Sequence, residues 1–114
     1  MQTPKISVII PAKNSERTIG KCLSRVFNQD YKPLEVIVVD GGSEDKTQEI
    51  AKYHGAKVLL EPVHAGNAPG IGRNFGARKA SGDILVFLDS DCYPEKTWLT
   101  KVANVLSNRK VGIY

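Results

Sequence analysis

Two carboxylates, Asp89 and Asp91, stand two residues apart directly after the apolar run Ile84–Leu88. Residues at this spacing on an extended backbone point the same way, so the two side chains can aim at one point. Paired carboxylate oxygens suit Mg²⁺ or Mn²⁺, which complete their coordination shell with water and substrate phosphates. The structural alternative is that Asp89 ends a strand and Asp91 caps the next helix. Both residues are therefore candidate metal ligands.

A glycine-rich segment, Gly66–Gly76, offers a second kind of chemistry. It leads into a predicted helix, whose N-terminus can hold an anion, and the forked guanidinium of Arg73 can reach a diphosphate. The segment lacks the G-x-G-x-x-G order of a dinucleotide-binding loop and the Gly-Lys-Ser/Thr of a P-loop. Taken alone, it favours a loop that carries a surface arginine.

The cysteines and histidines point to no further reaction centre. Cys22 lies on an apolar helix stripe and is expected in the core, while Cys92 follows the acidic pair and has no histidine near it. His54 and His64 are too few for a metal cluster. Two distant cysteines form neither a disulfide framework nor a zinc motif, and they are typical of a reducing, cytoplasmic compartment.

Four apolar runs rich in β-branched residues predict the elements that position these groups. The expected strands are Ile6–Ile10, Leu34–Val39, Lys57–Leu60 and Ile84–Leu88, with Pro11 ending the first. Residues 111–114 look like the start of a fifth strand. The runs do not alternate between apolar and polar residues, which predicts burial on both faces of a parallel sheet. Residues 1–114 are therefore expected to form one doubly wound α/β domain with helices on both faces.

Helical spacing fills the intervals between the strands. An apolar stripe at three- and four-residue spacing is formed by Ile19, Cys22, Leu23, Val26 and Phe27. Asn14 or Ser15 is expected to cap that helix, and Ser43 the next one. A third helix is expected from about Ile71 to Ala80, and a fourth with Pro94 in its first turn. Residues 61–70 form the longest unpatterned loop, a place where function often lies.

Composition narrows the classes of partner. The chain has 114 residues, of which 41% are hydrophobic and 25% charged, and 16 basic against 12 acidic residues give a net charge of +4. No apolar run approaches the roughly 18 residues that span a bilayer. The basic residues are scattered, which argues against a nucleic-acid partner. A mildly basic surface still favours phosphates or an anionic membrane face.

Four ordered blocks carry a resemblance to a known family. They are Ser7–Asn14, Val38–Thr47, Gly72–Ala77 with Ala80–Asp83, and Phe87–Asp91. The chain resembles glycosyltransferase family 2, inverting enzymes with the GT-A nucleotide-sugar fold. The resemblance implies transfer of a sugar from a nucleoside-diphosphate sugar to a sugar, lipid or protein acceptor.

The resemblance also implies roles for individual residues. Pro11, Ala12 and Asn14 would border the nucleoside, and Asp40 would lie near the base. Arg73 would lie close to the nucleotide, Asp89 near the ribose and diphosphate, and Asp91 on a Mg²⁺ or Mn²⁺ ion. That ion would neutralise the charge that develops on the departing diphosphate, and an arginine would add to the stabilisation.

Two departures from the family pattern leave the nucleobase open. Gly41 stands where the family usually has a second aspartate, and Lys13 where an aromatic residue is common. The family's acceptor site and its catalytic base lie in a further stretch of about a hundred residues, and no residue here matches that base. The chain is therefore expected to be the donor half of a longer protein and inactive alone. An uncovered sheet edge would favour self-association.

Other protein classes with this strand–helix pattern fit the sequence less well. A receiver-like domain needs acidic residues after the first strand, and a haloacid-dehalogenase-like phosphatase needs its Asp-x-Asp there. The main alternative is a non-catalytic nucleotide-binding module or the assembly partner of a separate catalytic chain. The resemblance also allows peripheral association with the cytoplasmic face of a membrane.

Overall fold

The computed structural model describes residues 3–62 and 71–106, with the side chain of Ile71 left out. The strands are β1 (Ile6–Ala12), β2 (Leu34–Asp40), β3 (Lys57–Leu60) and β4 (Ile84–Phe87). The helices are α1 (Ile19–Phe27), α2 (Thr47–Tyr53), α3 (Ile71–Lys79) and α4 (Trp98–Leu106). All strand pairs are parallel in the order β3-β2-β1-β4, which confirms the predicted sheet.

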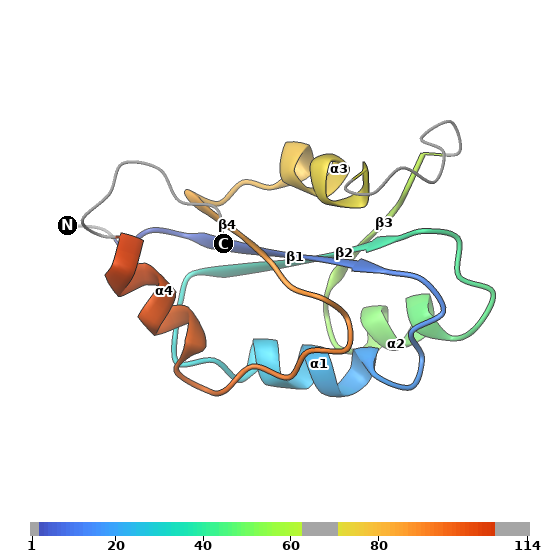
Figure 1. Cartoon of the computed structure of the whole chain (residues 1–114), viewed down its shortest axis with the longest axis horizontal. Helices are drawn as coiled ribbons and strands as arrows, with labels where there is room; N and C mark the ends of the chain where they lie inside the picture. The colour runs from blue at the N-terminus through green and yellow to red at the C-terminus, as the bar shows by residue number, and fades with distance from the viewer. Residues whose placement is uncertain (1–2, 63–70, 107–114) are drawn as a thin grey trace.

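Helices cover both faces of the sheet, as expected for a doubly wound domain. In Figure 1, α3 lies above the sheet, and α1 and α2 lie below it. Side chains of alternate β1 residues enter different clusters. Ile6, Val8 and Ile10 pack with residues of α1, α2 and α4, whereas Ile9 packs with Phe75 of α3. Burial on both faces explains why the strand sequences are continuously apolar.

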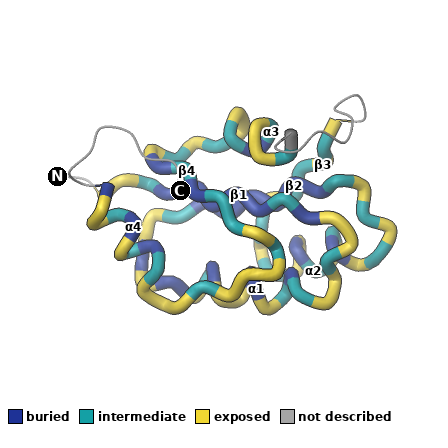
Figure 2. The backbone as a smooth tube through the Cα atoms, viewed as in Figure 1, coloured by how far each residue is buried: buried dark blue, intermediate teal, exposed yellow. Residues whose placement is uncertain are grey.

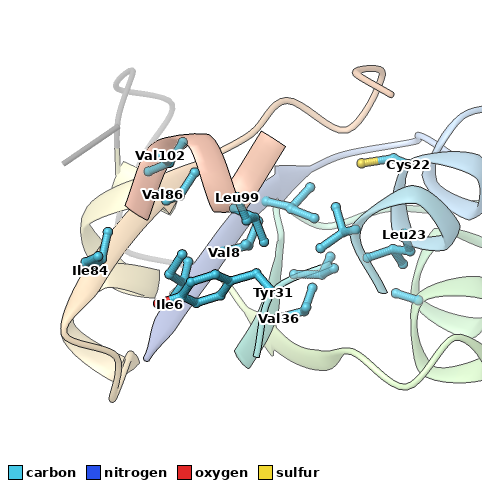
Figure 3. Close-up of a cluster of buried hydrophobic side chains, with 14 of the residues drawn as sticks. Ile6, Val8, Cys22, Leu23, Tyr31, Val36, Ile84, Val86, Leu99 and Val102 are labelled. Carbon is cyan, nitrogen blue, oxygen red and sulfur yellow. The ribbon is translucent and has the colours of Figure 1, made fainter. Parts of the chain in front are cut away.

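The larger of the two hydrophobic clusters packs the sheet against α1, α2 and α4. Figure 3 shows Val8 of β1 among Leu23 of α1 and Leu99 of α4, all fully buried. Cys22 also belongs to this cluster, as predicted, and burial raises the pKa of its thiol to about 12. The central strands are therefore buried, while the loops at their ends are mostly exposed (Figure 2).

The first strand does not end at Pro11. Residues Pro11 and Ala12 continue the parallel register opposite Val39 and Asp40. On the other side, the β1–β4 register reaches only the Ile9–Phe87 pair. Pro11 therefore occupies a local edge position, where a proline is tolerated because no neighbour there needs its amide hydrogen.

Three expected helix starts were wrong, and in two of them the expected polar cap has another hydrogen-bond partner. Helix α1 begins at Ile19, and Asn14 instead adopts a left-handed φ of 50°. Helix α2 begins at Thr47, and Ser43 instead donates to the carboxylate of Asp40 in the preceding strand. Helix α4 begins at Trp98, four residues after Pro94.

Two predictions concern residues outside the described ranges, the proposed fifth strand at 111–114 and most of the loop at 61–70. Within residues 3–62 and 71–106, no helix has the length and apolar character to cross a bilayer. Strands β3 and β4 form the two edges of the described sheet. The predicted self-association at such an edge stays a prediction.

Candidate functional site

The polar residues singled out in the sequence gather at the carboxyl end of the sheet. Three loops meet there: residues 13–18 after β1, residues 41–46 after β2, and residues 88–92 after β4. In Figure 1 this end is to the right of the label β1. Parallel strands deliver their following loops to the same edge, so the fold brings together groups that are up to 77 residues apart, as 91 − 14 = 77.

Side chain to backbone hydrogen bonds join the first two loops. The amide of Asn14 donates to Ser43 Oγ at 2.8 Å, and Asn14 Oδ1 accepts from the amide of Glu44 at 2.9 Å. The left-handed φ of Asn14 is a conformation that asparagine tolerates better than most residues. Ser15 continues the connection, because its hydroxyl lies 2.9 Å from that of Ser90. Asn14 and Ser15 therefore fix the loops relative to each other.

Asp40 is the buried anchor of this arrangement. It is fully buried and accepts hydrogen bonds from the amides of Gly42 and Ser43, the Ser43 hydroxyl and Gln48 Nε2. Burial alone would raise the pKa of the Asp40 carboxyl, but the bonds from Ser43, Gln48 and Gly42 outweigh it and lower the pKa. Asp40 thus holds the 41–43 turn and lines neither of the two hollows described below.

The acidic pair does converge, although for a different reason from the one the sequence suggested. Strand β4 ends at Phe87, and residues 89–92 form a turn in which the amide of Cys92 donates to the Asp89 carbonyl at 3.1 Å. One ligand atom each from Asp89, Asp91 and Cys92 lies within 4.8 Å of the others, and all three residues are exposed. The convergence comes from this turn and not from an extended backbone.

The chemistry of this group fits the divalent ion that the sequence predicted. Carboxylate oxygens are the ligands that Mg²⁺ and Mn²⁺ prefer, whereas a thiol suits softer ions. Asp89 and Asp91 therefore have the ligand type that such an ion prefers, and Cys92 lies beside them. Sequence reasoning set Cys92 aside because no histidine is near it, and its position directly after Asp91 was the available signal.

Arg73 approaches the acidic pair from α3. Its Nη2 lies 3.1 Å from Asp89 Oδ1, with the two side chains 44% and 63% exposed. An ion pair this exposed contributes little to stability, so it leaves both groups available to a ligand. The structure thus brings together three predicted residues, Arg73, Asp89 and Asp91, from two separate blocks of the sequence.

Two hollows flank Pro11 at this edge. The first, of about 600 Å³, is lined by Pro11, Asn14, Ser15, Glu16, Arg17, Thr18, Asp45, Asp89, Ser90 and Asp91. The second, of about 260 Å³, is lined by Pro11, Ala12, Lys13, Val39, Gly41, Glu61, Gly72 and Arg73. Every predicted site residue except Asp40 lines one of them. Sequence reasoning missed Glu61, which opens the unpatterned loop after β3.

Comparisons with known proteins show which family the chain is similar to. The profile of Glycosyl transferase family 2 matches residues 7–114. Glycosyltransferase AglE of Haloferax volcanii is 40% identical over 96% of this chain and 38% of its own length. An uncharacterized glycosyltransferase of Haemophilus influenzae is 36% identical over 93% of this chain and 44% of its own length. The chain thus spans less than half the length of these two relatives.

Solved structures are similar over the same region. S. aureus TarS, residues 1–349, superposes with a TM-score of 0.81 at 35% identity, covering 90% of this chain and 32% of its own. Glucosyl-3-phosphoglycerate synthase of Mycobacterium tuberculosis gives a TM-score of 0.76 at 32% identity, covering 92% and 40%. That structure contains Mn²⁺, UDP and glucosyl-3-phosphoglycerate. From the profile match, the identities and the shared fold, the chain belongs to glycosyltransferase family 2.

Proposed function

We propose that the protein transfers a sugar from a nucleoside-diphosphate sugar, and that this chain supplies the donor and metal half of the site. The observation that carries the proposal is the convergence of Asp89 and Asp91, with Arg73 beside them, where two hollows flank Pro11. Related structures hold UDP, UDP-GlcNAc and Mn²⁺. The two hollows have room for the two ends of such a donor, its base and its diphosphate.

The residues divide between these two ends. Asp91, with Asp89, would hold Mg²⁺ or Mn²⁺, which when bound offsets the negative charge that develops on the departing diphosphate. The guanidinium of Arg73 points its donors at the same region and adds electrostatic stabilisation without losing a proton. Asn14 lines the diphosphate end and fixes the loop around it.

The nucleoside end lies in the smaller hollow. Pro11 and Ala12 offer small apolar surfaces on which a base and ribose can pack. Asp40 lies beneath this region and acts through the turn that it holds, because its carboxylate oxygens already accept four hydrogen bonds. The acceptor and the base that deprotonates it are not assigned to any residue of this chain.

Thermal unfolding with added nucleotides tests the proposal. UDP, GDP and dTDP are each added with and without Mn²⁺ to the wild type, to Asp91→Asn and to Asp30→Asn. A ligand that binds only the folded state at 100 times its Kd stabilises it by about 2.7 kcal/mol, which raises Tm by several degrees. We expect one nucleotide to raise the Tm of the wild type only with Mn²⁺, and not to raise that of Asp91→Asn.

The matched control is Asp30→Asn. It removes the same charge from an exposed carboxylate that follows α1 at the opposite end of the sheet. It should respond to nucleotide and Mn²⁺ as the wild type does. The donor-site assignment is contradicted if the wild type unfolds cooperatively but its Tm does not change with any nucleotide at millimolar concentration in the presence of Mn²⁺.

A further inference from the structure

Glu61 brings an unassigned carboxylate into the smaller hollow. It follows β3, and its amide donates to the carbonyl of Asp40 at 2.9 Å, which fixes its backbone at the carboxyl edge of the sheet. Its side chain lines the hollow together with Pro11 and Arg73. Among residues 3–62 and 71–106, the Glu61 carboxylate has no hydrogen-bond or ion-pair partner. Within these ranges its acceptor positions are unfilled.

Two glycines leave the space in front of this carboxylate open. A methyl group at position 41 would lie 3.3 Å from Glu61 Oε2, and one at position 72 would lie 3.5 Å from Oε1. An added methyl group would make a tight contact with Oε2 at position 41 and an ordinary van der Waals contact with Oε1 at position 72. With Gly41 and Gly72 in place, each oxygen borders open space in the hollow.

The rest of the hollow suits a flat ring. Ala12 and Val39 present small apolar groups, and Lys13 and Arg73 supply positive charge at the side. An ionised carboxylate accepts hydrogen bonds and donates none, so a ring that faces Glu61 must present a donor. A ring that presents a lone pair there would leave the carboxylate desolvated and unpaired, which is costly.

We propose that Glu61 reads the nucleobase of the donor by accepting the hydrogen of a ring N–H. This inference rests on the proposed function, because it needs the nucleotide in these hollows. Uracil carries such a hydrogen at N3 and guanine at N1, whereas cytosine and adenine carry a lone pair at the same positions. Glu61 therefore selects uracil or guanine nucleotides against their cytosine or adenine counterparts.

Two matched pairs of nucleotides test this selection. UDP and CDP, then GDP and ADP, are titrated calorimetrically into this chain with Mn²⁺ present. In the pair that binds, we expect the nucleotide with the ring N–H to bind the wild type about 10- to 100-fold more tightly, the usual worth of a hydrogen bond to a charged group. Glu61→Ala and Glu61→Gln should each reduce that ratio at least several-fold.

Controls separate base reading from other effects. Glu49→Gln removes the same charge from an exposed side chain of α2 that lines neither hollow, and it should keep the wild-type ratio. In the Glu61 variants, an unchanged melting curve without ligand confirms the fold. The Mn²⁺ dependence of nucleotide binding should persist in these variants, because it depends on Asp91.

The outcomes are distinguishable. If the wild type binds UDP without preference over CDP, or GDP without preference over ADP, or if Glu61→Ala keeps the preference, the inference about Glu61 is wrong and the donor site stands. If the wild type binds none of the four nucleotides, both the donor site and the base-reading role are overturned.

Discussion

Two carboxylates at opposite ends of the sheet, Glu35 and Asp89, are used in opposite ways. At the amino end, Glu35 is only 6% exposed and accepts from Ser7 Oγ at 2.6 Å, Lys57 Nζ at 2.7 Å and the amide of Ser81 at 2.9 Å. At the carboxyl end, the Asp89 side chain is 63% exposed, and Arg73 is its one ion-pair partner among the described residues. A carboxylate whose acceptor positions are filled holds the fold together. One with unfilled positions keeps its capacity for a ligand.

The difference also appears in the protonation of Glu35. Burial would raise the pKa of the Glu35 carboxyl, but the hydrogen bonds from Lys57, Ser7 and Ser81 lower it from 4.5 to about 2. Lys57 reaches the carboxylate from β3 with 66% of its side chain exposed, so its own charge stays hydrated. The amino end thus joins β1, β2, β3 and the segment before β4 through a single side chain.

Removing Glu35 should therefore have the largest effect on stability. Glu35→Ala should lower the free energy of unfolding by about 3 kcal/mol, because it leaves the buried Ser7 hydroxyl and the Ser81 amide without their acceptor. Urea denaturation at neutral pH measures the change, and Glu49→Ala on the exposed face of α2 serves as control. A loss comparable to that of the control would show that the amino-end network does not hold the strands.

Lowering the pH should remove the stabilisation by the Glu35 carboxylate without a mutation. The folded-state pKa of Glu35 lies below its unfolded value, so its stabilisation is complete above pH 4.5 and is lost as pH falls towards 2. The shift corresponds to about 3 kcal/mol. Urea midpoints of the wild type should fall across this range more steeply than those of Glu35→Gln. Parallel pH profiles of the two proteins would contradict the assignment.

A smaller effect is expected from filling the space at Gly82. An added methyl group there would lie 2.5 Å from Ser7 Oγ and 2.7 Å from the Ser7 amide nitrogen, so backbone must move. Gly82→Ala should destabilise the fold by about 2 kcal/mol. Gly20→Ala in α1 is the matched control, because its new methyl group would meet its nearest atoms at 3.4 Å. Equal stability of the two variants would refute the close packing at the amino end.

The smallest change in stability should accompany the largest change in ligand binding. Asp91→Asn should alter the free energy of unfolding by about 0.5 kcal/mol or less, as for exposed substitutions in general. Its affinity for Mn²⁺, measured by calorimetry, should nevertheless fall, because an amide replaces the charged ligand. An Asp91→Asn protein that unfolds much more easily than the wild type would place Asp91 among the structural carboxylates.

Sequence patterns predicted the architecture because strands that are buried on both faces consist mainly of apolar residues. The continuous apolar runs of β1 and β2 indicated a sheet covered on both faces, and the helix stripe at 19–27 indicated the contact face of α1. Helix starts were less predictable. Asn14 and Ser43 are residue types that are common at helix N-caps. Their side chains instead form hydrogen bonds to each other's loops, which lie about 30 residues apart in sequence.

The site was predictable where residues sit directly after strands and unpredictable where long-range contacts place them. Asp89 and Asp91 follow β4, and the topology brings them to the edge. The structural role of Glu35 depends on Ser81, which is 46 residues away, so the apolar run around it gave no sign of the network. Glu61 likewise faces Gly41 and Gly72 only after folding.

The most direct test of the account is the coupling between metal and nucleotide at the carboxyl end. UDP, or GDP where it is the nucleotide that binds, is titrated into the wild type, Asp91→Asn and Glu35→Gln, with and without Mn²⁺. The account predicts that Mn²⁺ raises nucleotide affinity by about tenfold or more in the wild type and in Glu35→Gln, and does not in Asp91→Asn. Equal affinity with and without Mn²⁺ in the wild type, or coupling that survives in Asp91→Asn, would contradict it.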